Sequence, residues 1–285
     1  PVIQDNQIVD NISTGGGGGL FLGYSNAVVT ANVISNNSAG RSGGAFAISG
    51  QPDSPALIEG NTIADNRGQN GGAFSLFEAS PDILNNSILN NTATDIGGAI
   101  YLIMSSPLIS GNDITDNTAG STGGGMGIYF ESAPNIENNI IVGNQSDVGG
   151  GVSIYLASTP TVNGNVISDN RAVNGGGIVV NDESNPVITD NEIAENYSER
   201  NGGGIFVQSS TATIENNTIR NNEARREGGG IYAVLDSIIS VLNNLFDNNR
   251  ATSGGALFIA EGANVQFNDP DDNTYQGNVP DSINE

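Results

Sequence analysis

Asparagine recurs along this chain in two series, each with a step of about 26 residues. The two series stay in phase, because each member of the second follows a member of the first by five residues. The first series is Asn6, Asn32, Asn61, Asn86, Asn112, Asn139, Asn165, Asn191, Asn217 and Asn244. The second series is Asn11, Asn37, Asn66, Asn91, Asn117, Asn144, Asn170, Asn196, Asn222 and Asn249. A fixed period of this length restricts a chain to architectures that stack one unit many times.

Apolar residues keep the same phase as the asparagines. In a typical unit, Ile109 and Ile114 flank Asn112 on either side. A Gly-Gly pair follows the second asparagine of the unit and opens an alternating segment, such as residues 97–102. Short β-branched segments bounded by Asn, Gly or Pro are typical of strands and turns. Each unit is therefore predicted to hold three short strands.

One unit cannot bury its own apolar face, whereas stacked copies can. The 40 glycines and the net charge of −23 would suit a disordered chain, but 36% of the residues are hydrophobic and they are regularly placed. We therefore expect an all-β parallel β-solenoid of ten to eleven coils in a single domain, residues 1–285. Residues 1–262 would form ten regular coils. Residues 263–285 would form an incomplete last coil, opened by Val265, Asn268 and Asn273, and a C-terminal tail.

The twenty asparagines are predicted to form two structural ladders at the turns of the solenoid. Asparagine tolerates the left-handed backbone of a tight turn, and amide side chains stacked at strand spacing bond to one another. Ligand binding by these side chains is the alternative. The residue before the second asparagine alternates between acid and amide, as in Asp65, Asn90 and Asp116, so a row of divalent-cation sites is an alternative beside it.

The residue types that are missing exclude many chemistries. His, Cys and Lys are absent, and all eight basic residues are Arg. Nucleophile–histidine pairs, the usual zinc and copper ligands and a Schiff-base lysine are therefore excluded. The charge of −23 would repel a phosphate backbone, so nucleic acid is not an expected partner. No apolar run reaches the ~18 residues of a membrane span.

The repeat resembles that of right-handed parallel β-helix proteins, and more narrowly that of the polymorphic outer-membrane-protein type. Repeats of that type pair Gly-Gly-Ala-(Ile/Leu/Val) with Phe-x-x-Asn. The matching segments are Gly97-Gly98-Ala99-Ile100, Gly254-Gly255-Ala256-Leu257 and Phe246-Asp247-Asn248-Asn249. Most other copies carry Ile, Leu or Val in place of Phe, and many carry Gly in place of Ala. The resemblance implies a right-handed β-helix, but such proteins include adhesins, passenger domains and carbohydrate-active enzymes.

Aromatic residues recur at outward positions of the strand that follows Gly-Gly. We expect them to form a partial stripe along one face, which would serve as a sugar-stacking platform or a packing interface. Strand propensity alone is the alternative explanation. The predicted binding residues are Tyr101, Tyr129, Tyr155, Phe206, Tyr232 and Phe258, and Phe21 and Phe77 stand at corresponding positions.

Two adjacent acid pairs, Asp182-Glu183 and Asp271-Asp272, offer the paired carboxylates that glycoside hydrolysis needs. A solvated turn is the alternative for both. Asp269, Asp271 and Asp272 are candidate calcium ligands, although the segment lacks the glycine and terminal glutamate of an EF-hand loop. No cofactor other than calcium is expected.

Seven of the eight arginines lie between the second asparagine of a unit and its Gly-Gly pair. They are Arg41, Arg67, Arg171, Arg200, Arg225, Arg226 and Arg250, and the exception is Arg220. Acidic residues share this edge, so ion pairs between coils, such as Glu223 with Arg250, are one interpretation. Docking of the edge onto the acidic flank of a neighbouring molecule is the other.

The near-perfect repeat and the missing residue types favour a non-catalytic structural protein, outside the cell or on its surface. No capping helix is predicted at either end, so we expect a segment of a longer protein or a subunit that stacks end to end into filaments. Further copies of the chain are thus the expected partners. A carbohydrate-binding or adhesin module is the first alternative, with glycans as partners, and a polysaccharide lyase or hydrolase is the second.

Overall fold

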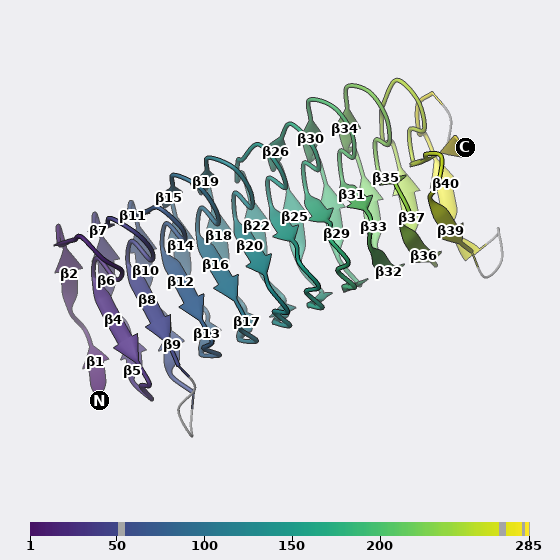
Figure 1. Ribbon diagram of the computed structural model, residues 1–285. Helices are drawn as coiled ribbons and strands as arrows, with labels where there is room; N and C mark the ends of the chain where they lie inside the picture. Colours follow the sequence, from purple (N-terminus) through teal and green to yellow (C-terminus); the bar gives the residue numbers. More distant parts are fainter. Residues whose placement is uncertain (51–54, 268–271, 281–282, 285) are drawn as a thin grey trace.

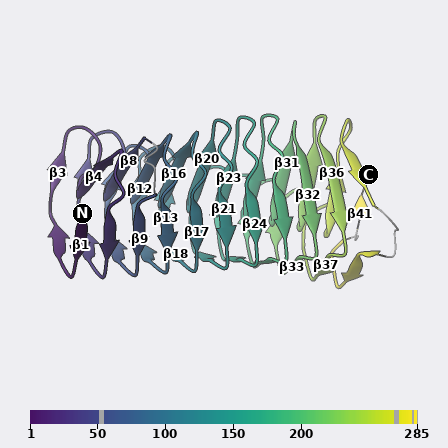
Figure 2. The same ribbon diagram turned by 90° about the horizontal axis from the view of Figure 1, so that it is seen from below.

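The computed structural model describes residues 1–50, 55–267, 272–280 and 283–284. Within them, three parallel sheets of eleven strands run the length of a rod (Figure 1). Each coil adds one strand to each sheet, which confirms the predicted parallel β-solenoid. The coils lie side by side from the N-terminal to the C-terminal end of the rod, as the view from below also shows (Figure 2).

Sheet 1 holds the strand that precedes the first asparagine of each coil. Its strands stay in register, so that Ile109 pairs with Ile83 on one side and Ile136 on the other. The strands are β1 (Val2–Gln4), β5 (Val28–Thr30), β9 (Leu57–Glu59), β13 (Asp82–Leu84), β17 (Leu108–Ser110), β21 (Asn135–Glu137), β24 (Thr161–Asn163), β28 (Val187–Thr189), β32 (Thr211–Glu215), β36 (Ile238–Leu242) and β39 (Asn264–Gln266).

Sheet 2 holds the strand between the two asparagines. Its central residue points inward, as Ile114 does between Ile88 and Ile141. The strands are β2 (Gln7–Val9), β6 (Val33–Ser35), β10 (Thr62–Ala64), β14 (Ser87–Leu89), β18 (Asp113–Thr115), β22 (Ile140–Val142), β25 (Val166–Ser168), β29 (Glu192–Ala194), β33 (Thr218–Arg220), β37 (Leu245–Asp247) and β40 (Thr274–Gln276).

Sheet 3 holds the strand that follows Gly-Gly. It has two inward positions per strand, which Ile100 and Leu102 occupy in the fourth coil. The strands are β4 (Leu20–Gly23), β8 (Phe46–Ser49), β12 (Phe74–Phe77), β16 (Ile100–Ile103), β20 (Met126–Tyr129), β23 (Val152–Ile154), β27 (Ile178–Val180), β31 (Ile205–Gln208), β35 (Ile231–Val234), β38 (Leu257–Ile259) and β41 (Ile283–Asn284).

A fourth set of strands, each two residues long, was not among the three strands expected per coil. They follow the second asparagine and form one sheet of five strands and one of three in the described residues. Their bounds are β3 (Ile12–Ser13), β7 (Ser38–Ala39), β11 (Arg67–Gly68), β15 (Thr92–Ala93), β19 (Thr118–Ala119), β26 (Arg171–Ala172), β30 (Tyr197–Ser198) and β34 (Glu223–Ala224). These strands belong to the long second corner, which joins sheet 2 to sheet 3.

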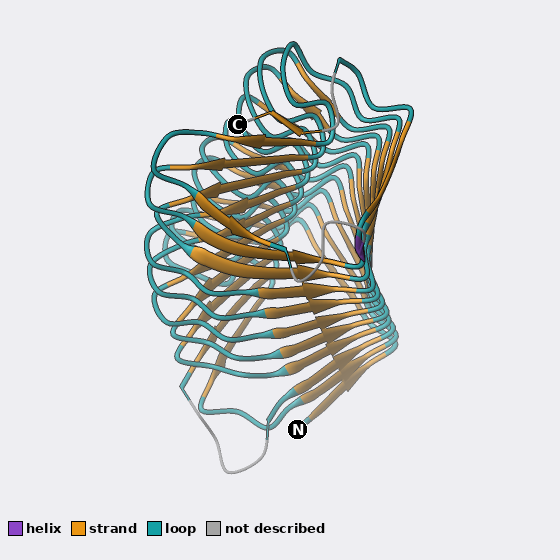
Figure 3. Cartoon of the chain, turned by 90° about the vertical axis from the view of Figure 1, so that its right-hand side faces the viewer, coloured by secondary structure: helices purple, strands orange, loops and turns teal. Residues whose placement is uncertain are grey.

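The core fills the inside of the rod with the inward residues of the three main sheets. Ile100, Leu102, Ile109 and Ile114 are all fully buried, and burial of one such side chain stabilises the fold by about 1.5–3 kcal/mol. A short first corner joins sheet 1 to sheet 2, and a third corner joins sheet 3 to sheet 1 of the next coil. Figure 3 shows these turns stacked along the edges of the strand layers.

The Gly-Gly pair of the second corner is needed for two different reasons. Gly97, the first of its pair, has a φ of 68°, in the left-handed region that favours glycine. Gly98, the second, has no room for a side chain, because a Cβ there would lie 2.1 Å from the carbonyl oxygen of Gly124 in the next coil. The pair therefore lets the second corner stack directly on itself.

Candidate functional site

The structure places the twenty predicted asparagines in two continuous ladders. Asn117 is representative, because its side-chain amide donates to the side-chain oxygen of Asn144 and to the carbonyl of Ile88, both at 3.0 Å. Its own side-chain oxygen accepts the backbone N–H of Asn91 at 2.9 Å. Asn117 is fully buried. Each ladder therefore links every coil to its neighbours through side chains as well as backbone.

Both ladders continue into the last coil, but not through the residues that the spacing suggested. Asn244 bonds to Asn273 and Asn249 bonds to Asn278, so Asn273 belongs to the first ladder rather than the second. Asn268 lies outside the described residues. The expectation was wrong because the five-residue spacing of Asn268 and Asn273 imitates the repeat, whereas a longer connection separates β39 from β40. A strand of sheet 3, β41, also pairs with β38 although no Gly-Gly precedes it.

A third ladder, of serines, runs along the third corner and was not predicted. The backbone N–H of Ser105 donates to the hydroxyl of Ser132 at 3.1 Å, and that of Ser132 donates to Ser158 at 3.3 Å. The series continues through Ser184 to Ser210. The signal lies in the sequence as a repeated Ser-x-Pro, in Ser105-Ser106-Pro107, Ser132-Ala133-Pro134, Ser158-Thr159-Pro160 and Ser184-Asn185-Pro186.

The predicted aromatic residues fall into two columns on the outer side of sheet 3. The first outward position of its strand holds Tyr101, Phe206, Tyr232 and Phe258, and the second holds Tyr129 and Tyr155. Tyr129 and Tyr155 stack with ring centroids 5.1 Å apart, and Phe206, Tyr232 and Phe258 form a separate stack. Strand β27, which carries Val179, separates the two stacks. The aromatic stripe is therefore interrupted.

Most of these rings are buried, because the second corner folds back over the outer side of sheet 3. The exposed fractions are 8% for Tyr101 and Tyr129 and 7% for Tyr232. The hydroxyls of Thr122, in the second corner, and Tyr129 share a hydrogen bond of 2.6 Å. Burial raises the pKa of Tyr101 to about 12, with a smaller contribution from Asp95, and burial also raises the pKa of Tyr129. The stacked rings cover one another's faces, so they leave little ring face for a sugar.

The seven arginines of the second corner are exposed. Glu223 and Arg250 are neighbours across coils, as expected, but no ion pair within 4.0 Å joins them in the described residues. The Tyr197 ring instead lies between two arginines, with the guanidinium carbon of Arg171 4.8 Å from its centroid and that of Arg225 5.7 Å away. Sequence spacing did not single out Tyr197.

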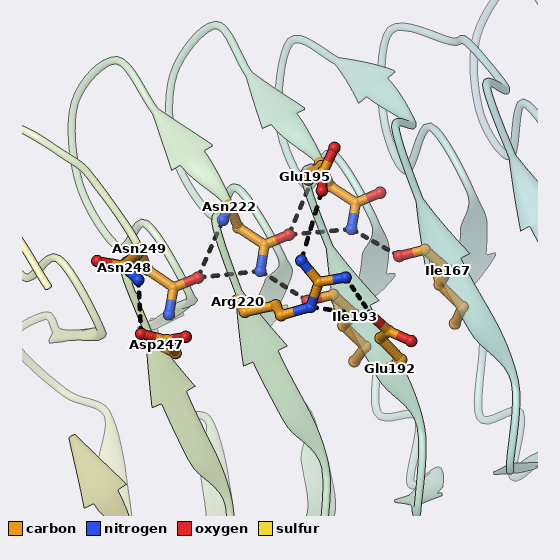
Figure 4. Close-up of polar contacts among 10 residues, drawn as sticks. Ile167, Glu192, Ile193, Glu195, Arg220, Asn222, Asp247, Asn248 and Asn249 are labelled. Atoms are coloured by element: carbon orange, nitrogen blue, oxygen red, sulfur yellow. Dashed lines mark hydrogen bonds and ion pairs between the residues drawn. The ribbon is translucent and has the colours of Figure 1, made fainter. Parts of the chain in front are cut away.

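The ion pairs in the described part of the chain are made by the eighth arginine, on the outer face of sheet 2 (Figure 4). The Nε of Arg220 donates to Glu192 at 2.9 Å, and Nη1 lies 3.4 Å from Glu195. Asp247 stands beside Arg220 in the next coil. Hydrogen bonding to Glu192 raises the pKa of Arg220 further. All three paired side chains are at least one-third exposed, so the pairs contribute little to stability.

The third corner carries bulky apolar residues in a left-handed backbone. Tyr24, Met104, Phe130 and Leu235 all have φ near 50°, and between 42% and 77% of each is exposed. This conformation is uncommon for large side chains and is strained by about 1–3 kcal/mol each. The first corner holds Asp, Asn or Gly at nearly every equivalent position. In these four coils the third corner therefore exposes a bulky apolar side chain, whereas other positions of the same corner carry acids such as Glu78 and Asp182.

The two acid pairs are not brought together with other ligands. Asp182 and Glu183 are exposed at the third corner, each with a left-handed backbone. Asp269 and Asp271 lie outside the described residues, and Asp272 is exposed. The described residues contain no group of three or more acidic side chains placed to hold a metal ion. Calcium binding stays a prediction.

The comparison with protein families agrees with this geometry. The family described as the right handed beta helix region matches residues 1–131, 41–174, 83–246 and 172–284. The chain belongs to the right-handed β-helix family. Each family match covers several coils, which is what a solenoid of near-identical units should give. No curated protein and no solved structure matches the chain.

The family membership settles the hand of the solenoid, and it does not select one activity. Among the described residues of this β-helix, no helix is long and apolar enough to cross a membrane.

Proposed function

We propose that this β-helix is a non-catalytic structural rod that lies outside the cell or on its surface. The observation that carries the proposal is the set of buried side-chain ladders. The two asparagine ladders join every coil from Asn6 to Asn278, and the serine ladder joins the middle coils. Ladders of this kind give a stiff rod with the same cross-section throughout. The resemblance to the polymorphic outer-membrane-protein type supports a surface location.

The proposal includes stacking of one copy on another, end to end. The bonds between ladder side chains are directional, since each side-chain amide donates to the side-chain oxygen of the asparagine in the coil that follows it. A copy placed on the last coil would meet the donors of Asn273 and Asn278 with the side-chain oxygens of its own Asn6 and Asn11. Contacts of this head-to-tail kind do not close on themselves and therefore give filaments.

Electron microscopy and sedimentation at increasing concentration test this proposal. We expect rods of one coil diameter whose length grows with concentration. The variant Ile8→Asp places a charge on an inward residue of the first coil, and it should shorten the rods. Val9→Asp, with the same charge on an outward and exposed neighbour, is the matched control. A monomer at high concentration would contradict stacking, and turnover of an acidic polysaccharide would contradict the non-catalytic role.

A carbohydrate-binding module is the second candidate, and exposed rings in the first coils favour it. Phe21, Tyr24 and Phe77 are 65%, 77% and 46% exposed, so their faces are far more accessible than those of the stacked rings. Glycan binding that is lost in Tyr24→Ala and kept in Tyr129→Phe would support this function. Binding that is lost equally in both variants, or that is absent, would count against it.

A further inference from the structure

Five of the eight arginines cluster in four successive coils of the second corner. We name Arg171, Arg200, Arg225, Arg226 and Arg250 the arginine corner. All five are exposed, and they outnumber the acidic residues among them, which are Glu199, Glu223 and Glu227, with Asp147 beside Arg171 in the preceding coil. The arginine corner is therefore locally positive on a chain with a net charge of −23. An isolated cluster of this sign on so acidic a surface calls for a physical explanation.

Stacking on a tyrosine ring holds two side chains of the arginine corner in place and leaves their positive charges unpaired within the described residues. Tyr197 lies between Arg171 of the preceding coil and Arg225 of the following coil, at the cation–π distances given above. In the part of the chain that the structure describes, the ion pairs involve Arg220 and not these five residues. Burial, and then the nearby carboxylate of Glu227, raise the pKa of Tyr232. The guanidinium groups of Arg171 and Arg225 are thus fixed by stacking, while their N–H edges stay available.

We propose that the arginine corner is a lateral docking edge that binds the acidic face of a second copy of this chain. Charge complementarity identifies the partner surface on the copy. Sheets 1 and 2 of the third to sixth coils, with the short corner between them and the residue that follows each strand of sheet 2, carry no basic residue. The carboxylates on this acidic face are Glu59, Asp65, Asp82, Asp113, Asp116 and Glu137.

The spacing of the two surfaces is compatible. The arginine corner places charges in four successive coils. Carboxylates of one column on the acidic face lie two coils apart, as in Asp65 and Asp116, or three coils apart, as in Glu59 and Glu137. Strands in neighbouring coils are ~4.8 Å apart. In two rods with parallel or antiparallel axes, the coils therefore recur at the same distance along both rods. Guanidinium groups pair with carboxylates in paired hydrogen bonds. More than one such contact can therefore form at once, at every second or third coil.

This contact is lateral, and it adds to the rod proposed above without depending on end-to-end stacking. Rods joined only end to end would stay one coil wide, whereas docking at the arginine corner gives pairs or bundles. Blocking the stack with Ile8→Asp leaves the arginine corner untouched, so the two proposals fail separately.

The test measures dimerisation of the full chain carrying Ile8→Asp by sedimentation equilibrium, at ionic strengths of about 0.02 and 0.5 M. The double variant Arg171→Gln/Arg225→Gln should weaken dimerisation at least tenfold at low salt, and high salt should weaken it in the parent chain. Arg41→Gln/Arg67→Gln is the matched control, because it removes the same charge from exposed arginines of the same corner outside the cluster.

A second pair of substitutions locates the partner surface. Asp113→Asn/Asp116→Asn should weaken dimerisation of the parent chain, although these changes lower the overall repulsion between copies. A parent chain that remains monomeric at low salt would overturn the proposal, as would equal effects of the two arginine pairs. Binding of dextran sulfate that needs Arg171 and Arg225, without dimerisation, would overturn it in favour of an anionic polymer.

Discussion

The side-chain amide of Asn117 donates to the side-chain oxygen of Asn144, 3.0 Å away in the next coil. The backbone N–H of Asn117 donates to the same oxygen at 2.9 Å. One amide oxygen thus accepts from both the side chain and the backbone of a single residue, and this arrangement recurs along both ladders. The turn and the contact between coils are therefore fixed by the same atoms.

Replacing one ladder residue should destabilise the rod strongly. Asn117→Ala leaves the backbone N–H of Asn91 and the carbonyl of Ile88 without their side-chain partner inside the fold. Each buried polar group left unpaired costs about 1–3 kcal/mol, so we expect a loss of about 3–5 kcal/mol in urea unfolding. Asn135→Ala, on the exposed side of β21, is the control and should change stability by less than about 0.5 kcal/mol. Equal losses would contradict the ladder's role.

Glycines of the second corner should differ in their tolerance of replacement by alanine. A Cβ on Gly124 would lie 2.3 Å from the carbonyl oxygen of Gly150 and 2.6 Å from the backbone nitrogen of Gln145. Gly124→Ala should therefore separate the coils and lower the melting temperature markedly. Gly15→Ala, in the same corner of the first coil, is the control, because a Cβ there would lie 3.9 Å from its nearest neighbour, the hydroxyl oxygen of Ser13. A melting curve for Gly124→Ala that matches the control would argue against close stacking of this corner.

The buried tyrosines predict a loss of stability at alkaline pH. Burial raises the pKa of Tyr101 to about 12, so the folded state keeps its proton at a pH where the unfolded state, with a pKa of about 10, releases it. The contribution of protonated Tyr101 to the free energy of unfolding is therefore complete below pH ~10 and is lost as the pH rises to ~12. Urea unfolding across this window should show a smaller decline for Tyr101→Phe than for the parent chain. An unchanged decline would contradict the assignment.

Replacing one residue of the serine ladder should also destabilise the rod, but by less than the loss of a ladder asparagine. The hydroxyl of Ser132 donates to the carbonyl of Tyr129 at 2.6 Å and accepts the backbone N–H of Ser105. Ser132→Ala removes both bonds from a fully buried site, and we expect a loss of about 1–3 kcal/mol. Ala133→Ser, which adds a hydroxyl at the exposed next position, should be close to neutral. Hydrogen exchange at the Ser105 amide should become faster in Ser132→Ala alone.

The period of the sequence was enough to predict which residues share a column. Ile109 and Ile114 are buried and Asn112 and Asn117 form ladders, because a solenoid converts a fixed spacing directly into a stack. The period does not predict which residues cover the outward-facing side chains of a column. Tyr129 occupies an outward position and is nevertheless buried, because the second corner, through Thr122, folds back over it.

Irregular spacing and unexpected contacts account for the other differences. Asn273 follows Asn244 in the first ladder, whereas its five-residue spacing after Asn268 imitates the second, because a longer connection separates β39 from β40. The position of Tyr197 between Arg171 and Arg225 depends on side-chain conformations in three coils. The residue spacing does not specify these conformations, so neither the geometry of the arginine corner nor the available N–H edges of Arg171 and Arg225 could be predicted.

The order in which the coils are linked has a mechanical consequence. Each coil bonds only to the coil before it and the coil after it, and every such bond runs along the axis of the rod. A force that pulls the two ends apart therefore loads the coils in series, and the weakest junction opens first. One coil of about 26 residues spans ~90 Å when drawn straight. Under tension this protein should lengthen in discrete steps of nearly that size, as one coil after another unfolds.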